Sequence, residues 1–136
     1  MAKLRHVAIM VPDPEKTAKF FMDTFGMEQV GTTESPLSTG VFLSDGTINL
    51  AVLNFKDDRS AGVPGGKDSI CINHIGFWVD DLKEIDAQIT GNGGALMLGL
   101  PDDPDDRKEL FYEVKYKNPD GIIIDVSAHG WVGAKL

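Results

Sequence analysis

Hydrophobic and polar positions follow the same pattern in the two halves of the 136-residue chain. Residues 5–13 (RHVAIMVPD) align without gaps on residues 73–81 (NHIGFWVDD). Both read histidine, apolar, small, two apolar residues, valine, any residue and aspartate. Short apolar runs of this kind are typical of buried strands. Each half is therefore predicted to open with a strand that carries a histidine near its start.

A helix signal follows each of these strands. Asp13 stands as an N-cap before Pro14, and Asp81 forms the pattern of a capping box with Glu84. The next stretches place apolar residues on one stripe and end at a glycine: Ala18, Phe21, Met22 and Phe25 before Gly26, and Leu82, Ile85 and Ile89 before Gly91. Two short amphipathic helices are predicted.

Three further strands are predicted in each half. They cover residues 29–32, 41–43 and 48–53 in the first half and residues 94–98, 111–116 and 122–126 in the second. The last two strands of each half flank a turn with Asp and Gly, as a hairpin does. The fold class is therefore α+β, with two tandem β-α-β-β-β modules.

The length of the chain fits one domain, which we expect to span residues 1–136. Module one is predicted at residues 1–55 and module two at residues 71–136. Residues 56–70 are polar and rich in Gly, Asp and Ser, and we interpret them as the linker. A charged stretch at residues 102–106 is predicted to be a loop in module two.

Charge and composition exclude several classes of partner. The formal net charge of −8 repels phosphate backbones and anionic lipids, and no Lys/Arg cluster with interleaved aromatic residues is present. No apolar run approaches the roughly 20 residues that span a bilayer, and the N-terminus has no signal-peptide core. The one cysteine, Cys71, is predicted to be a small buried residue. We expect a cytoplasmic location, with no nucleic-acid or membrane partner.

His6 and His74 occupy equivalent places on the two opening strands. A lone strand histidine is usually a hydrogen-bonded or surface imidazole, but a matched pair favours metal coordination. Asp125 interrupts an apolar strand, where burial of a carboxylate is unfavourable unless the charge is paired or coordinated. An edge aspartate that faces water or a Lys/Arg neighbour is the alternative. His6, His74 and Asp125 are our candidate metal ligands.

Two imidazoles and one carboxylate leave open positions on the cation, as in non-haem iron(II) oxygenases. A structural zinc site takes four protein ligands, usually with several cysteines, so this chain does not fit one. Glu113 lies close enough on the last hairpin to be a spare ligand or a general base, and it is our candidate catalytic residue. A solvent-facing strand glutamate is the commoner reading of such a position.

Over essentially its whole length the chain resembles the vicinal oxygen chelate superfamily, which includes glyoxalases, bleomycin-resistance proteins and extradiol dioxygenases. The resemblance implies that two β-α-β-β-β modules form a curved mixed sheet around a cleft with one divalent metal ion. His6 and His74 match the ligands on the first strands. Pro119-Asp120-Gly121 and three further residues place Asp125 where the family has a glutamate ligand.

The same count from Asp45-Gly46 ends on Leu50, where glyoxalase I and methylmalonyl-CoA epimerase would have glutamate or glutamine. Asn49 is expected to face inward only if a bulge turns it. The resemblance still implies a metal-dependent enzyme, of lyase, isomerase or dioxygenase type, whose small substrate chelates iron, manganese, nickel or zinc through neighbouring oxygens. It also implies a homodimer.

A metal-free protein that binds a small molecule or drug is the alternative within the same superfamily. Its ligand would occupy the cleft between the modules as an apolar pocket. The missing ligand at Leu50 and the short side chain of Asp125 favour this alternative, and the histidine pair opposes it. Aromatic residues that could line the cleft are Phe77, Trp78, Tyr112 and Trp131.

Overall fold

The computed structural model describes residues 1–98 and 113–136, and in them the order of strand, helix and three strands occurs twice. The first half consists of β1 (Lys3–Met10), α1 (Pro14–Phe25), β2 (Glu28–Glu34), β3 (Ser38–Ser44) and β4 (Asn49–Phe55). The second consists of β5 (Cys71–Trp78), α3 (Leu82–Gly91), β6 (Ala95–Leu98), β7 (Val114–Lys117) and β8 (Ile123–Ser127). The predicted α+β fold is confirmed.

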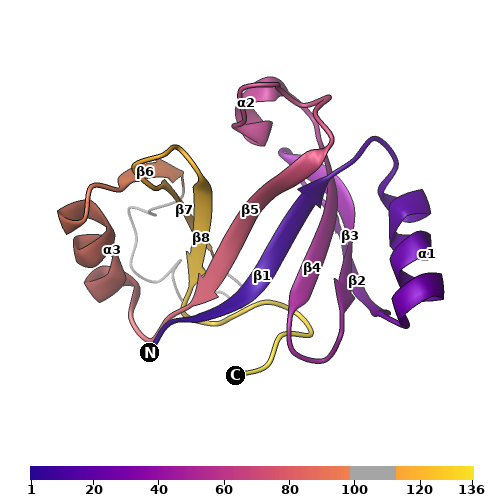
Figure 1. Ribbon diagram of the computed structural model, residues 1–136, viewed down its shortest axis with the longest axis horizontal. Coiled ribbons are helices and arrows are strands. Elements are labelled where there is room, and N and C mark those ends of the chain that lie inside the picture. The colour runs from indigo at the N-terminus through magenta and orange to yellow at the C-terminus, as the bar shows by residue number, and fades with distance from the viewer. Residues whose placement is uncertain (99–112) are drawn as a thin grey trace.

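The strands form one curved 8-stranded sheet in the order β2-β3-β4-β1-β5-β8-β7-β6 (Figure 1). The two halves join side by side in one chain, because β1 pairs with β5 in antiparallel orientation. Within each half the first and last strands run parallel, as β1 with β4 and β5 with β8. The opening strands that carry His6 and His74 are therefore neighbours at the centre of the sheet.

The two longer helices lie at opposite ends of the sheet (Figure 1). Both begin as predicted, since the side chain of Asp13 accepts a hydrogen bond from the backbone N–H of Lys16 and that of Asp81 from the N–H of Glu84. α1 ends at Gly26, which has a φ of 69° and so occupies the left-handed region that glycine tolerates.

Alternate residues of the central strands face opposite sides of the sheet. On β4, Ala51, Leu53 and Phe55 join Ala8 and Met10 in a cluster on the concave side. Val52 and the half-buried Leu50 point the other way and pack against α1. α3 buries its apolar stripe on β7 and β8 in a separate cluster. The helices pack near the two ends of the sheet, so the concave side at its centre is left uncovered by α1 and α3 and can hold a site.

Several local expectations need correction. The predicted linker contains a short helix, α2 (Asp58–Ala61), which the polar composition concealed. Cys71, the first residue of β5, is exposed and not buried. The predicted loop at 102–106 and the first two residues of the 111–116 strand lie outside the described residues. Along the described part of the chain, no helix is both long and apolar enough to cross a membrane.

Candidate metal centre

The structure brings the three predicted ligands together on the concave side of the sheet. The Nε2 atoms of His6 and His74 lie 3.0 Å apart, and Asp125 Oδ2 lies 3.0 Å from His74 Nε2 and 4.0 Å from His6 Nε2. The side chains are buried, with 3%, 2% and 0% of their surfaces exposed. They come from β1, β5 and β8, so the site spans both halves of the chain.

Strand register explains why these side chains meet. His6 is paired with Gly76 on β5, and Gly76 is paired in turn with Asp125 on β8. A Cβ atom on Gly76 would lie 2.8 Å from His6 Cβ and 2.9 Å from the ring of Trp131. The small residue two places after the second histidine therefore leaves the space that the first histidine and Trp131 occupy.

An asparagine sets the tautomer of His6. Asn49 donates from Nδ2 to the carbonyl of Val132, at 2.8 Å, so its Oδ1 faces His6 Nδ1 at 2.7 Å. An amide oxygen can only accept, so His6 carries its proton on Nδ1. The lone pair of Nε2 then points into the site, where a metal ligand needs it.

A second asparagine does the same for His74. Asn73 donates from Nδ2 to the carbonyl of Ala61 at 2.8 Å, and its Oδ1 lies 2.7 Å from His74 Nδ1. The β1–β5 register shifts between Ala8 and the next residue of β1, which leaves Asn73 without a partner there. This irregularity turns Asn73 and His74 inward together, so both are buried.

Lys115 is the neighbour of Asp125 on β7, and sequence reasoning did not single it out. Its Nζ lies 2.8 Å from Oδ1 and 2.7 Å from Oδ2 of Asp125. The alternative interpretation of Asp125 expected a Lys or Arg neighbour, and Lys115 is that neighbour. Asp125 is nevertheless not on an edge strand, because β8 lies between β5 and β7.

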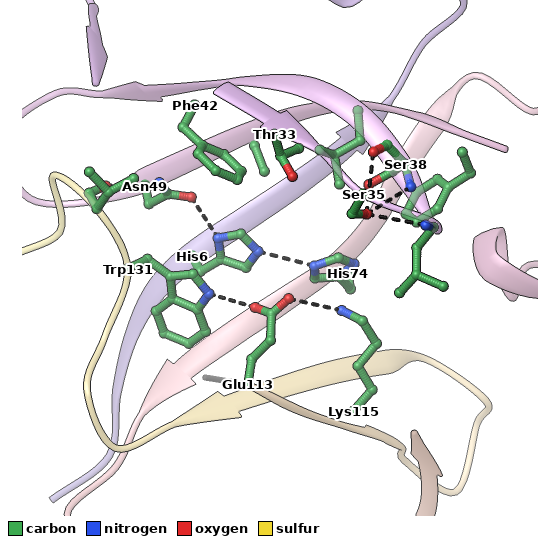
Figure 2. A pocket seen from close by; sticks show the side chains of 15 residues that line it. His6, Thr33, Ser35, Ser38, Phe42, Asn49, His74, Glu113, Lys115 and Trp131 are labelled. Carbon is green, nitrogen blue, oxygen red and sulfur yellow. Dashed lines mark hydrogen bonds and ion pairs between the residues drawn. The ribbon is translucent and has the colours of Figure 1, made fainter. Parts of the chain in front are cut away.

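Glu113 precedes β7 and points into the same space (Figure 2). Its Oε2 accepts a hydrogen bond from Trp131 Nε1 at 2.7 Å, and its Oε1 lies 3.5 Å from Lys115 Nζ. The ring of Trp131 stacks on His6 with centroids 4.7 Å apart and planes at 5°. Glu113 is among the residues that line the pocket, and 34% of its side chain is exposed.

Burial and neighbouring charges set the protonation states. Burial, reinforced by His74, lowers the pKa of His6 to about 3, and burial also lowers the pKa of His74. Both imidazoles are therefore neutral near pH 7. Burial alone would raise the pKa of Asp125, but Lys115 and then His74 outweigh it and lower that pKa.

The two remaining groups respond differently. Burial and the charge of Asp125 raise the pKa of Glu113 to about 7, so its carboxyl group can exchange a proton near neutral pH. Burial lowers the pKa of Lys115, but Asp125 and Glu113 more than compensate and the net shift is upward. Lys115 is a buried cation.

The donor atoms fit a divalent cation. Two ligands about 2.1 Å from one cation and at right angles to each other lie about 3 Å apart, as two of the three separations here do. With both imidazole protons on Nδ1, no hydrogen lies between the two Nε2 atoms, whose lone pairs converge. Neutral imidazoles with a carboxylate suit iron, manganese, nickel or zinc.

A cavity of about 300 Å³ is lined by His6, His74, Glu113 and Lys115, with Asp125 buried behind its wall (Figure 2). One wall is polar, with both histidines, Glu113 and Lys115. The opposite wall, from β3, β4 and the turn before β3, is mainly apolar: Leu37, Phe42, Ala51, Leu53 and Phe55. Phe77 and Trp78 are not among the described lining residues, whereas Trp131 is, and Tyr112 lies outside the described residues.

The expectation for a fourth ligand at Leu50 needs correction. Ala8 is paired with Ala51 on β4 as Gly76 is paired with Asp125 on β8, so Ala51 is the counterpart of Asp125. Asn49 faces the site without any bulge, because it is paired directly with His6 in an unbroken register. The count from the turn failed because four residues separate Gly46 from Ala51, whereas three separate Gly121 from Asp125.

Comparison with known proteins agrees with this geometry. The model of the Glyoxalase/Bleomycin resistance protein/Dioxygenase superfamily matches residues 3–126. A lactoylglutathione lyase from Haemophilus influenzae is 25% identical over 134 residues, which cover 83% of this chain and 93% of that protein.

Solved structures share the fold. A hypothetical protein from Bacillus halodurans has a TM-score of 0.70 and 16% identity, with 92% of each chain covered. A variant of Streptomyces coelicolor methylmalonyl-CoA epimerase in complex with 2-nitronate-propionyl-CoA has a TM-score of 0.67 and 21% identity, with 93% of this chain and 97% of that chain covered. At such identities the likeness concerns the fold alone.

Proposed function

The chain belongs to the Glyoxalase/Bleomycin resistance protein/Dioxygenase superfamily, and on this premise we propose that it is a metal-dependent enzyme for a small substrate with two neighbouring oxygens. His6, His74 and Asp125 hold one divalent cation. Glu113 is the catalytic base that removes a proton from the carbon next to a substrate carbonyl. The reaction is then of the lyase or isomerase type, and dioxygenase chemistry is the alternative at the same site.

One observation carries the proposal. Three buried donor atoms from β1, β5 and β8 converge within 4.8 Å, and each histidine has its Nδ1 proton held by an asparagine carbonyl. Metal-binding histidines characteristically donate their second N–H to such an acceptor. With the proton on Nδ1, the Nε2 lone pair of each histidine faces other acceptor atoms, His74 Nε2 for His6 and Asp125 Oδ2 for His74, each at 3.0 Å, and a cation between them would stabilise this arrangement.

A cation bound there would polarise a substrate carbonyl and stabilise the negative charge that develops on its oxygen. The protein supplies the proton transfer. Glu113 is held by Trp131 on one oxygen and faces Lys115 with the other, so its carboxylate is fixed at the rim of the site. A proton taken from carbon would rest on Glu113 until it is returned to the product.

The cavity indicates the size and polarity of the substrate. About 300 Å³ accommodates a molecule of small-metabolite size. The apolar wall of Phe42, Leu53 and Phe55 lies across from the polar groups, and it would take an apolar substituent. We therefore propose a 2-oxo acid or hydroxyketone with an alkyl or aryl side chain.

A metal-free binding protein is the second candidate, and two observations favour it. The ammonium of Lys115 already neutralises Asp125, and the counterpart of Asp125 in the first half is Ala51, which has no donor atom. The same apolar pocket would then hold the ligand.

Exchange of substrate C–H hydrogen with deuterium from the solvent tests whether the protein is an enzyme of this kind. Protein loaded with Fe²⁺ (without oxygen), Mn²⁺, Ni²⁺ or Zn²⁺ is incubated in D₂O with 2-oxo acids and hydroxyketones that carry methyl, isobutyl or benzyl groups. NMR then follows the loss of C–H signal next to the carbonyl. We expect wild-type protein to catalyse exchange and Glu113→Gln to slow it by about 10²- to 10⁴-fold, the usual contribution of a general base.

His129→Ala is the matched control, because His129 lies in the C-terminal tail outside the ligand cluster in the described chain. It should exchange at the wild-type rate. Exchange by Glu113→Gln at the wild-type rate would contradict the role of Glu113. Tight binding of the same compounds by metal-free protein, without any exchange, would favour the second candidate.

A further inference from the structure

Lys115 is a buried cation in contact with the proposed metal ligand. It faces Asp125 across the β7–β8 pair, in direct register. Its ammonium lies within 2.8 Å of both carboxylate oxygens, and only 12% of the side chain is exposed. Asp125 Oδ2 is thus shared between Lys115, at 2.7 Å, and His74 Nε2, at 3.0 Å.

The position of this ammonium affects any cation at the site. A divalent ion on Asp125 and a lysine on the same carboxylate would repel each other at short range, with little water between them. Part of the negative charge that attracts the ion is already neutralised by Lys115. Both effects weaken the binding of metal.

The same ammonium stabilises the protein when no metal is bound. Asp125 is fully buried, and an unpaired carboxylate there would be strongly unfavourable. Lys115 provides the compensating charge from within the fold. Glu113 Oε1, at 3.5 Å, offers a second carboxylate toward which the flexible lysine end can turn.

We propose that Lys115 is a built-in counter-ion that competes with the metal for Asp125. It neutralises the buried carboxylate in the apo protein, and it sets the metal affinity of the site below the value that the three ligands alone would give. When a cation binds, the ammonium turns from Asp125 toward Glu113. This inference rests on the proposed function, since it concerns the same metal site.

The test measures metal affinity and apo stability. Calorimetric titration with Co²⁺ compares wild type, Lys115→Met and Lys117→Met. Lys117 is the matched control, because it lies two residues along β7 on the same face but forms no ion pair in the described residues. Lys115→Met should bind Co²⁺ at least about tenfold more tightly than wild type. Lys117→Met should stay within about twofold.

Thermal stability is measured on the metal-free proteins in the presence of a chelator. Here Lys115→Met should be the weaker protein, although it binds Co²⁺ more tightly. Lys115→Met should melt below Lys117→Met, because only the first variant leaves Asp125 without its counter-ion. If Lys115→Met does not fold, Lys115→Gln carries the same prediction, since it removes the charge and keeps a hydrogen-bond donor. An unchanged or weaker Co²⁺ affinity in the folded, charge-removed variant would overturn the proposal.

The outcomes separate this proposal from the proposed function. Wild-type affinity in His6→Ala would show that Co²⁺ binds elsewhere, and the proposed function would fail. If wild type binds no Co²⁺ at all, the proposed function also fails as stated. The lysine proposal then requires that Lys115→Met gains Co²⁺ binding, and no gain overturns it.

Discussion

Each histidine of the site depends on an asparagine that is not itself a ligand. Asn49 is 1% exposed and connects two parts of the chain, since its amide group bonds His6 on β1 and the carbonyl of Val132 in the tail. Without Asn49 Oδ1, nothing holds the His6 proton on Nδ1. The proton can then move to Nε2, where it blocks the lone pair that would bind the metal. The metal affinity of the site should therefore depend on Asn49.

We predict that Asn49→Leu, which has nearly the same volume, lowers Co²⁺ affinity by about 10- to 100-fold. Asn54→Leu is the control, because Asn54 lies on the same strand and its amide bonds the backbone carbonyl of Val11, away from the pocket. Its Co²⁺ affinity should match wild type. Equal losses in the two variants would mean that the strand, and not the histidine tautomer, is affected.

The sequence predicted the residues whose signal is local. His6 and His74 stand out because the pattern around them repeats, and Asp125 because a carboxylate in an apolar strand needs a partner. Lys115 and Asn73 were missed, and Asn49 was expected to face inward only with a bulge, since the roles of all three depend on which strands pair and in which register. The Lys115–Asp125 contact could not be read from the predicted turn at 118–121, because pairing about that turn places Lys115 opposite Ile124, whereas five residues, 118–122, separate the paired Lys117 and Ile123.

At the scale of elements, β1 and β5 pack closely against each other at the centre of the sheet. Gly76 on β5 lies so close to His6 that a Cβ atom would be 2.8 Å from the histidine Cβ. The ring of His6 stacks on the ring of Trp131, which lines the pocket. An added methyl group must displace one of them.

We predict that Gly76→Ala lowers the free energy of unfolding by about 1–3 kcal/mol, the range for overpacking a core. Urea unfolding measures it. Gly91→Ala is the matched control, because its Cβ would meet nothing within 4 Å at the end of α3, and alanine there should be neutral or stabilise by up to about 1 kcal/mol. A Gly76→Ala protein as stable as the Gly91→Ala protein would contradict the close packing.

The elements themselves were largely predictable, because caps and alternation are local signals. Asp13 and Asp81 begin the helices as predicted, and Gly26 ends the first one. The helix α2 was missed, since four polar and small residues carry no amphipathic stripe. Bulges were not predictable either, and the β5 irregularity at Asn73 decides which side chains of that strand face inward.

At the scale of the whole molecule, the site belongs to neither half alone. His6 lies in the first half, and His74 and Asp125 lie in the second. The chain after β8 runs back toward β1 and β4 (Figure 1), where the carbonyls of Val132 and Gly133 accept hydrogen bonds from Asn49 and Ser44. Binding at this junction should stabilise the assembled molecule.

Other properties of the whole molecule stay predictions. These are the homodimer, the cytoplasmic location and the division into modules at residues 1–55 and 71–136 with a linker between them. The contacts of the tail with β3 and β4 show that residues 131–136 pack on the first half, although the division assigns them to the second.

The central claim is that one metal ion binds at this junction through His6, His74 and Asp125. Elemental analysis of untagged wild type and His74→Ala, purified side by side, tests it most directly. We predict about one iron, manganese, nickel or zinc ion per wild-type chain and a loss of most of it in His74→Ala. Equal metal content in the two proteins, or none in wild type even after reconstitution with each of the four ions, would contradict the account.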